Sequence, residues 1–194
     1  MNLEKAIVNK RIPKNRFSFA MPEVESIFWR YKISKETTGI GDSDDYKELQ
    51  VMEIVFKEKP KLNYFIKIQK SIPYKILYMY NYKDSKYFAM ALDKVIIETE
   101  KVLIENDKLC FDSLYIKSLI VRLYEYITNI KQREAESIEE YEERYVEIYS
   151  LRKRIESLQK LIDSEKQPKK KFEYNEEMRT RSEELGARSL GDRG

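Results

Sequence analysis

Apolar and polar side chains alternate over residues 24–34, and this period-two pattern predicts a β-strand with one buried face. A second run, residues 49–57, is rich in β-branched and apolar side chains and predicts a strand that pairs antiparallel with the first. The apolar side of the first strand carries Ile27, Trp29, Tyr31 and Ile33. We therefore expect Trp29, the only tryptophan, to anchor a core.

The spacing then changes to a helical period over residues 61–71, which follow Pro60. Strands are expected next at 74–82 and 87–92, joined by a turn at 83–86, and a further strand over 95–104. The order strand–strand–helix–strand–strand predicts an α+β fold with a mostly antiparallel sheet.

From about residue 112 the apolar positions follow a helical stripe, which predicts a helix packed on the sheet. The stripe consists of Leu114, Ile116, Leu119, Ile120, Leu123 and Ile127. Ser137 and Glu140 then have the spacing of a capping box and predict a helix over 138–165.

The steps between apolar positions in 138–165 mostly alternate between three and four, which is typical of a coiled-coil seam. Residues 167–171 are expected to form a turn, and 172–185 a return helix that touches the first through Met178 and Leu185. These patterns predict four segments. They are a basic N-terminal arm at 1–20, an α+β domain at 21–133, a charged coiled-coil hairpin at 134–185 and a disordered tail at 186–194.

Composition narrows the possible chemistry. The chain has no histidine and one cysteine, which excludes histidine-based catalysis, His-containing metal sites and an internal disulfide. Charged residues make up 37% of the chain, which favours a large solvated surface. We expect Cys110 to be a buried structural thiol. With no signal-peptide segment or long apolar run, the sequence predicts a soluble cytoplasmic protein. Because it contains no recognisable catalytic or metal-ligating motif, we also expect no cofactor or metal.

A basic surface is expected near the N-terminus, because phosphate binding needs several cations that act together. Its candidate nucleic-acid-binding residues are Lys10, Arg11, Lys14 and Arg16 from the arm and Arg30 and Lys32 from one face of the first strand. A solvated basic surface without a ligand is the alternative, since the formal net charge is only +3.

The helical arm also has two interpretations: a self-contained hairpin, or a seam offered to a second copy or a larger partner. The large apolar groups of the first helix lack strong complements in the return segment, which favours a partner. The candidate partner-binding residues are Tyr141, Tyr145, Ile148, Ile155, Leu158 and Ile162.

A metal-dependent nuclease needs acids and a lysine at short spacing near a Mg²⁺ site. Asp84-Ser85-Lys86 is the nearest such triplet, but a hairpin turn explains its composition equally well.

Three blocks carry a family resemblance: Asn9–Lys14, Trp29–Lys32 and Ile72–Tyr74. Through them the chain resembles the prokaryotic family called domain of unknown function 4391, over most of its length up to about Leu185. The resemblance implies no active site. It does imply a context of helicases and DNA methyltransferases in loci that resemble restriction or anti-phage defence systems.

The resulting hypothesis is a non-catalytic accessory subunit of a helicase-containing DNA-processing or defence complex. Its arm would dock a helicase or another subunit, and its basic face would bind DNA or RNA. The alternatives are a metal-dependent nuclease subunit and a structural protein that forms homo-oligomers through the arm, neither of them membrane-bound.

Overall fold

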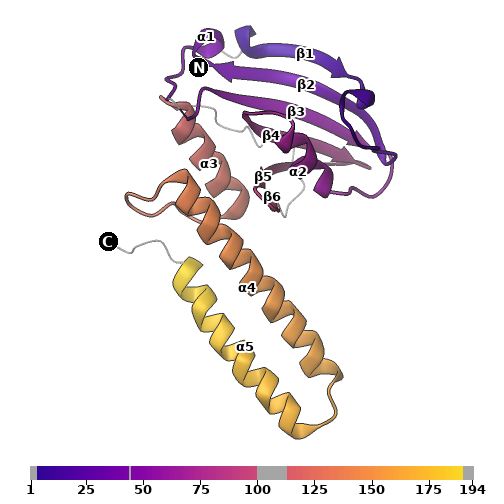
Figure 1. The fold of residues 1–194 in the computed structure, drawn as a ribbon, viewed down its shortest axis with the longest axis vertical. Coiled ribbons are helices and arrows are strands. Elements are labelled where there is room, and N and C mark those ends of the chain that lie inside the picture. The colour runs from indigo at the N-terminus through magenta and orange to yellow at the C-terminus, as the bar shows by residue number, and fades with distance from the viewer. Residues whose placement is uncertain (1–3, 44, 100–112, 190–194) are drawn as a thin grey trace. The chain divides into compact units, whose positions relative to one another are not determined.

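A six-stranded sheet in which the strands follow one another in sequence order organises the first part of the chain (Figure 1). The computed structural model describes residues 4–43, 45–99 and 113–189, and the chain divides into two compact units, Met1–Asn129 and Ile130–Gly194. The strands are β1 (Ile7–Ile12), β2 (Val24–Ser34), β3 (Glu48–Phe56), β4 (Lys75–Tyr82), β5 (Ser85–Leu92) and β6 (Val95–Glu98). All neighbouring strands except β3 and β4 are antiparallel, so the predicted α+β class with a mostly antiparallel sheet is confirmed.

Strands β3 and β4 run parallel, because helix α2 (Asn63–Lys70) carries the chain back across the sheet between them. The Gln69 side chain fastens the end of this helix to β4. Its amide nitrogen donates to the carbonyl of Tyr74 at 2.7 Å, and its amide oxygen accepts from the Ile76 nitrogen at 3.1 Å. The predicted helix at 61–71 is thus present.

Helix α2 covers the sheet face that carries Tyr78. The rings of Phe65 and Tyr78 stack with centroids 4.4 Å apart, and the Tyr78 hydroxyl donates to the Phe65 carbonyl at 2.9 Å. Both residues are fully buried, and this burial stabilises the fold by roughly 1.5–3 kcal/mol per large side chain. Trp29 is half-buried and packs against this core.

Helix α3 (Ile116–Thr128) packs on the opposite face of the sheet. The Tyr124 ring lies near Lys75 of β4, and the Tyr126 ring lies near Phe88 of β5. By the alternation of side chains along β4 and β5, Lys75 and Phe88 lie on the opposite face of the sheet from Tyr78. The predicted stripe is buried from Ile116 to Ile127. Leu114 is an exception, because the helix starts after it and its side chain is 82% exposed.

The N-terminal residues differ from the expected arm, because β1 joins the sheet as its edge strand. Short helices flank or follow it: η1 (Glu4–Ala6), η2 (Lys14–Arg16) and α1 (Lys35–Thr38). The β4–β5 connection is tighter than the expected four-residue turn, with Lys83 at φ 53°. The strand expected at 95–104 ends at Glu98; residues 100–104 and Cys110 lie outside the described part.

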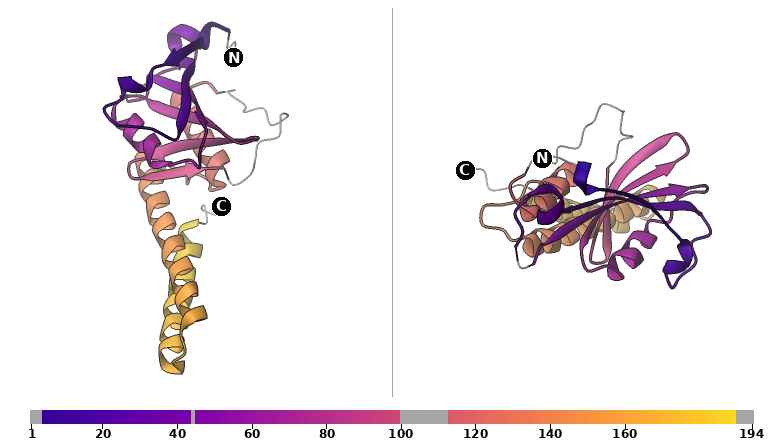
Figure 2. Two further views of the ribbon diagram at one scale, coloured as in Figure 1. Left: turned by 90° about the vertical axis from the view of Figure 1, so that its right-hand side faces the viewer. Right: turned by 90° about the horizontal axis from the view of Figure 1, so that it is seen from above.

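The second unit contains two long helices, α4 (Ile138–Ser164) and α5 (Pro168–Ser189), which lie side by side in Figures 1 and 2. The predicted capping box is formed: the Ser137 hydroxyl accepts from the Glu140 nitrogen at 3.1 Å, and the Glu140 carboxylate accepts from the Ser137 nitrogen at 2.7 Å.

The turn between the two helices is shorter than expected. Helix α5 begins at Pro168, so Lys169–Lys171 belong to its first turn, where proline is favoured because it lacks an amide hydrogen. The Glu165 carboxylate accepts hydrogen bonds from the Lys166 and Gln167 nitrogens, both at 2.8 Å. Helix α5 also continues to Ser189, so residues 186–189 are helical and not part of a disordered tail.

Candidate nucleic-acid interface

The cations of the N-terminal segment lie on β1 and η2, at one edge of the sheet. Arg11 stands opposite Phe28 of β2, and Lys10 stands opposite Trp29. Lys10, Arg11 and Arg16 are exposed, and across the residues that the structure describes their side chains make no ion pair or hydrogen bond. We call these three residues the basic edge. Their charges are available to an anionic ligand.

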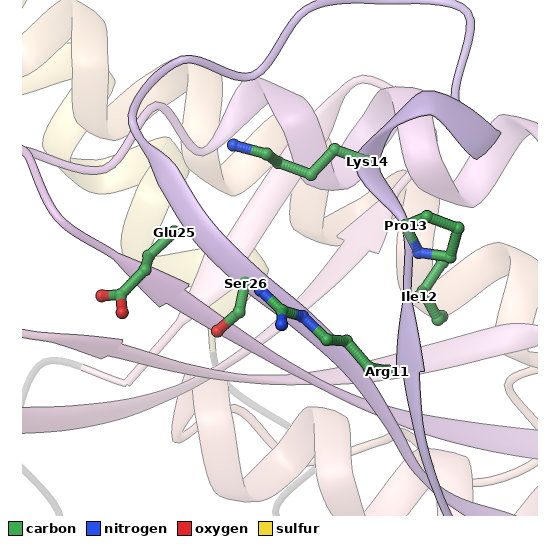
Figure 3. Close-up of a pocket in the computed structure, with 6 residues that line it drawn as sticks. All are labelled: Arg11, Ile12, Pro13, Lys14, Glu25 and Ser26. Atoms are coloured by element: carbon green, nitrogen blue, oxygen red, sulfur yellow. The ribbon is translucent and has the colours of Figure 1, made fainter.

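A hollow of about 330 Å³ opens beside the basic edge (Figure 3). Figure 3 shows Arg11 extended from β1 across to Ser26 of β2. Lys14 donates from Nζ to the Val24 carbonyl at 2.8 Å, so its ammonium is held over the start of β2. Glu25 lies on the hollow's wall and is its one acidic residue. The hollow is therefore lined by two cations, Arg11 and Lys14, and one acid.

Arg30 and Lys32 do not join the basic edge. A β-bulge between Trp29 and Tyr31 interrupts the alternation of side chains along β2. As a result, Arg30 and Lys32 contact residues of β3 that lie on opposite faces of the sheet. Arg30 pairs with Glu53 and Lys32 with Glu48, whose Oε2 lies 3.1 Å from Nζ. The hydrogen bond and the charge of Glu48 raise the pKa of Lys32.

These pairings correct the expected single basic face. Regular alternation would have placed Arg30 and Lys32 on one side of the strand, but the extra residue of the bulge separates them. Both cations are already matched by carboxylates, so they have less charge to offer a phosphate than the basic edge.

A polar network centred on Glu53 was not foreseen from the sequence. Its carboxylate accepts from Arg30 Nε at 2.6 Å and from Asn81 Nδ2 at 2.5 Å, and Arg30 also donates to the Asn9 side chain. The Arg30 guanidinium lies 4.5 Å from the centre of the Phe28 ring. The participating strands are distant in sequence, so only their pairing brings these groups together.

This network lies next to the basic edge in the sheet, because Arg11, Phe28, Glu53 and Met79 occupy one continuous row of the register. Glu53 is half-buried, with 17% of its side chain exposed, and Phe28 and Met79 are also half-buried. The row thus combines a free cation, an aromatic ring and a hydrogen-bonding network. Such a surface can contact phosphates through the cation and bases through the ring.

The six seam residues proposed for partner binding lie on α4, and five of them are buried: Tyr141, Tyr145, Ile148, Leu158 and Ile162. Ile155 is half-buried. The apolar seam is thus already covered within the chain and is not presented as an open surface.

A buried ion pair holds the open end of the hairpin. Arg144 and Glu136 are 6% and 7% exposed, and Arg144 donates to both carboxylate oxygens of Glu136, at 2.5 and 2.8 Å. Arg144 also donates to the carbonyls of Lys131 at 2.9 Å and Arg188 at 3.1 Å. It thereby satisfies a carbonyl at the C-terminal end of α5. Burial alone raises the pKa of Glu136, but hydrogen bonds from Arg144 and the Arg133 amide lower it overall.

The residues considered for a nuclease site are placed differently. Asp84 and Lys86 are exposed around the tight β4–β5 connection, and Glu53 is engaged by Arg30 and Asn81. Within the described residues there is no group of three or more acidic, histidine or cysteine side chains that could hold a metal ion.

The fold and this surface define a mixed α+β protein with a basic sheet edge. The chain belongs to the family described as Domain of unknown function (DUF4391), whose model matches residues 4–112. The match spans all six strands and stops before α3, so it does not reach the helical segment that the sequence resemblance had included. No curated protein and no solved structure matches the chain. Among the helices that the structure describes, none is long and apolar enough to cross a membrane.

Proposed function

We propose that this protein is a non-catalytic accessory subunit of a helicase-containing DNA-processing or anti-phage defence complex, and that it binds nucleic acid through the basic edge. The observation that carries the proposal is the group of three exposed cations on β1 and η2, none with an acidic partner among the described residues. Each phosphate neutralised by such a cation releases counterions, which favours binding without reading a sequence.

The context of helicases, methyltransferases and restriction-type loci comes from the family resemblance, and it supports DNA processing as the setting. The polar network beside Phe28 supports the same role, because an aromatic ring flanked by hydrogen-bonding groups is suited to an unpaired base.

The helical arm serves as the docking element in this proposal, although not through its covered seam. The tip of the hairpin exposes Phe172 at 66% and Leu161 at 38%, on facing helices near the turn. Lys169–Lys171 immediately precede Phe172, and the Glu165 carboxylate is occupied by backbone nitrogens. An apolar contact surrounded by lysines suits an acidic surface on the partner subunit.

The nucleic-acid part is tested by measuring the affinity of the full chain for short single strands and duplexes of DNA and RNA across a salt series. Changing Arg11 and Arg16 to alanine should weaken binding to all sequences and reduce the slope of log K against log salt by roughly one unit per lost contact. Arg179→Ala removes an exposed arginine of α5 and serves as the matched control.

A wild-type chain that binds no nucleic acid at low salt, alone or with its partner, would contradict the interface. Mg²⁺-dependent cleavage in the same assay would instead select the nuclease alternative. For the docking role, Phe172→Glu should abolish co-purification with the helicase of the same locus, while Phe172→Leu should retain it. A stable homo-oligomer that binds neither nucleic acid nor helicase would select the structural alternative.

A further inference from the structure

A second hollow, of about 380 Å³, lies on the sheet face that α2 covers, the opposite face from the Glu53 network. Its size falls within the range of small-molecule sites. It is lined by Lys59, Pro60, Leu62, Tyr80, Tyr82, Tyr87, Glu98 and Thr99. None of these residues belongs to the basic edge.

Tyrosine rings supply one wall of this hollow. Tyr80 and Tyr87 are paired across β4 and β5, and their rings stack with centroids 4.8 Å apart and planes 13° apart. Tyr80 is buried, and it is fixed from behind by an edge contact with Phe56 at 5.9 Å. Tyr87 and Tyr82 are only half-buried. Tyr87 therefore stacks on a tyrosine that is itself held in place, and part of the Tyr87 side chain stays exposed to a ligand.

Polar groups of opposite charge line the same hollow. The Tyr80 hydroxyl donates to Glu98 Oε2 at 2.5 Å, which orients a carboxylate that is otherwise exposed. A carboxylate oxygen has further lone pairs, so Glu98 retains the capacity to accept from a ligand. Lys59 is exposed, and no described residue forms an ion pair with it. The hollow thus offers an acceptor, a stacking surface and a cation.

We propose that this hollow binds a guanine nucleotide, with the base stacked on Tyr87, its Watson–Crick edge donating to Glu98, and its phosphate near Lys59. Guanine presents two adjacent donors, N1–H and the N2 amino group, to which an acceptor-only carboxylate is complementary. Adenine, cytosine and uracil each place an acceptor beside their donor, and this acceptor would face the carboxylate. A quaternary ammonium ligand would also suit tyrosine and glutamate, but the ammonium of Lys59 opposes it.

The inference goes beyond the proposed function. The basic edge would bind phosphates whatever the base, whereas this hollow would recognise guanine specifically. The same chemistry could come from a free nucleotide or from a guanine within a single strand. Free guanosine monophosphate tests the hollow without the basic edge. An oligonucleotide of uracil tests the basic edge without guanine. Failure of one assay therefore leaves the other interpretable.

The experiment is calorimetric titration of the full chain with the 5′-monophosphates of guanosine, adenosine, cytidine and uridine. Guanosine monophosphate should bind, and the other three should bind about tenfold or more weakly, as expected for the loss of one charge-assisted hydrogen bond. Glu98→Gln should remove this preference, because an amide offers one donor and one acceptor. Tyr87→Leu should weaken binding of guanosine monophosphate, and Tyr87→Phe should preserve it.

Glu58→Gln is the matched control, since Glu58 is an exposed acid on the same loop as Lys59 but does not line the hollow. Circular dichroism of each variant verifies that it is folded. Stronger binding of a strand with one guanine than of a uracil strand of the same length identifies a base within a nucleic acid; equal binding of the two strands, with free guanosine monophosphate still bound, identifies a free nucleotide. No binding of guanosine monophosphate, or equal binding of all four nucleotides, overturns the proposal.

Discussion

At the scale of single residues, charge pairing determines which polar side chains remain available to a ligand. Glu23 is an acid whose carboxylate is bound by other side chains. It is 6% exposed, forms an ion pair with Lys61 and accepts a hydrogen bond from the Tyr64 hydroxyl at 2.5 Å. The hydrogen bonds from Lys61 and Tyr64 lower the pKa of Glu23 from 4.5 to about 2. This cluster joins the segment before β2 to the start of α2.

The pKa of Glu23 implies a specific response to acid. Because it is lower in the folded chain, its contribution to stability is complete above about pH 4.5 and is lost as the pH falls through about 2. We predict that Glu23→Gln lowers stability at neutral pH and flattens the acid dependence between these values. Urea denaturation at a series of pH values measures this effect. Glu25→Gln, at the exposed neighbouring position, is the control. An unchanged acid dependence in Glu23→Gln would contradict the assignment.

At the scale of elements, charged side chains affect both the edge strand β1 and the helical hairpin. Cations on β1 are available to an anionic ligand, and they also discourage pairing of this edge with another chain. In the hairpin, no residue of α5 is fully buried, so side-chain packing alone holds this helix weakly. Polar contacts between α4 and α5 add to the stability of the hairpin. Arg154 donates to both carboxylate oxygens of Glu177 at 2.8 Å, and Arg144 donates to the Arg188 carbonyl at the C-terminal end of α5.

Arg144 should therefore be essential to the hairpin. We predict that Arg144→Ala destabilises the second unit by about 3–5 kcal/mol, because the Glu136 carboxylate would remain buried without its partner. Urea denaturation followed by far-ultraviolet circular dichroism measures the loss of helix. Arg179→Ala, which removes an exposed arginine of α5, should change stability by less than about 1 kcal/mol.

Combining Arg144→Met with Glu136→Gln should recover part of the stability, since neither replacement leaves a buried charge. If Arg144→Ala were no more destabilising than Arg179→Ala, the buried pair would not be what holds the hairpin.

At the scale of the whole molecule, the chain divides into two compact units. The first, Met1–Asn129, includes the sheet and the helices on both of its faces. The second, Ile130–Gly194, includes α4 and α5 and lies beyond the residues matched by the family model. The match covers the six strands and α2 of the first unit and reaches neither α3 nor the hairpin.

This division predicts that a chain ending at Gln132 remains folded. A sheet of this size with a packed helix has its own core and does not require the hairpin seam. Near-ultraviolet circular dichroism should retain the native aromatic signal, and nucleic-acid affinity should persist while helicase docking is lost. A shortened chain that keeps its far-ultraviolet signal but loses the near-ultraviolet one would be molten, which would contradict the separation of the units.

The local elements could be predicted from the sequence, because their signals depend on neighbouring residues. Period-two alternation identified β2, helical spacing identified α2 and most of α3, and the Ser137–Glu140 spacing identified the capping box. The return helix was expected as well, although its boundaries were too narrow at both ends. Boundaries depend on single capping contacts, which a periodic pattern does not contain.

The grouping of the polar residues could not be predicted in this way, because it depends on how the strands pair. A single bulge in β2 separated Arg30 from Lys32, and the pairing of distant strands assembled Asn9, Arg30, Glu53 and Asn81 into one network. The hollow around Tyr87 likewise joins the loop before α2 to three strands. Strand register and side-chain coverage depend on contacts far apart in the chain, and the spacing of residues along one segment carries no information about them.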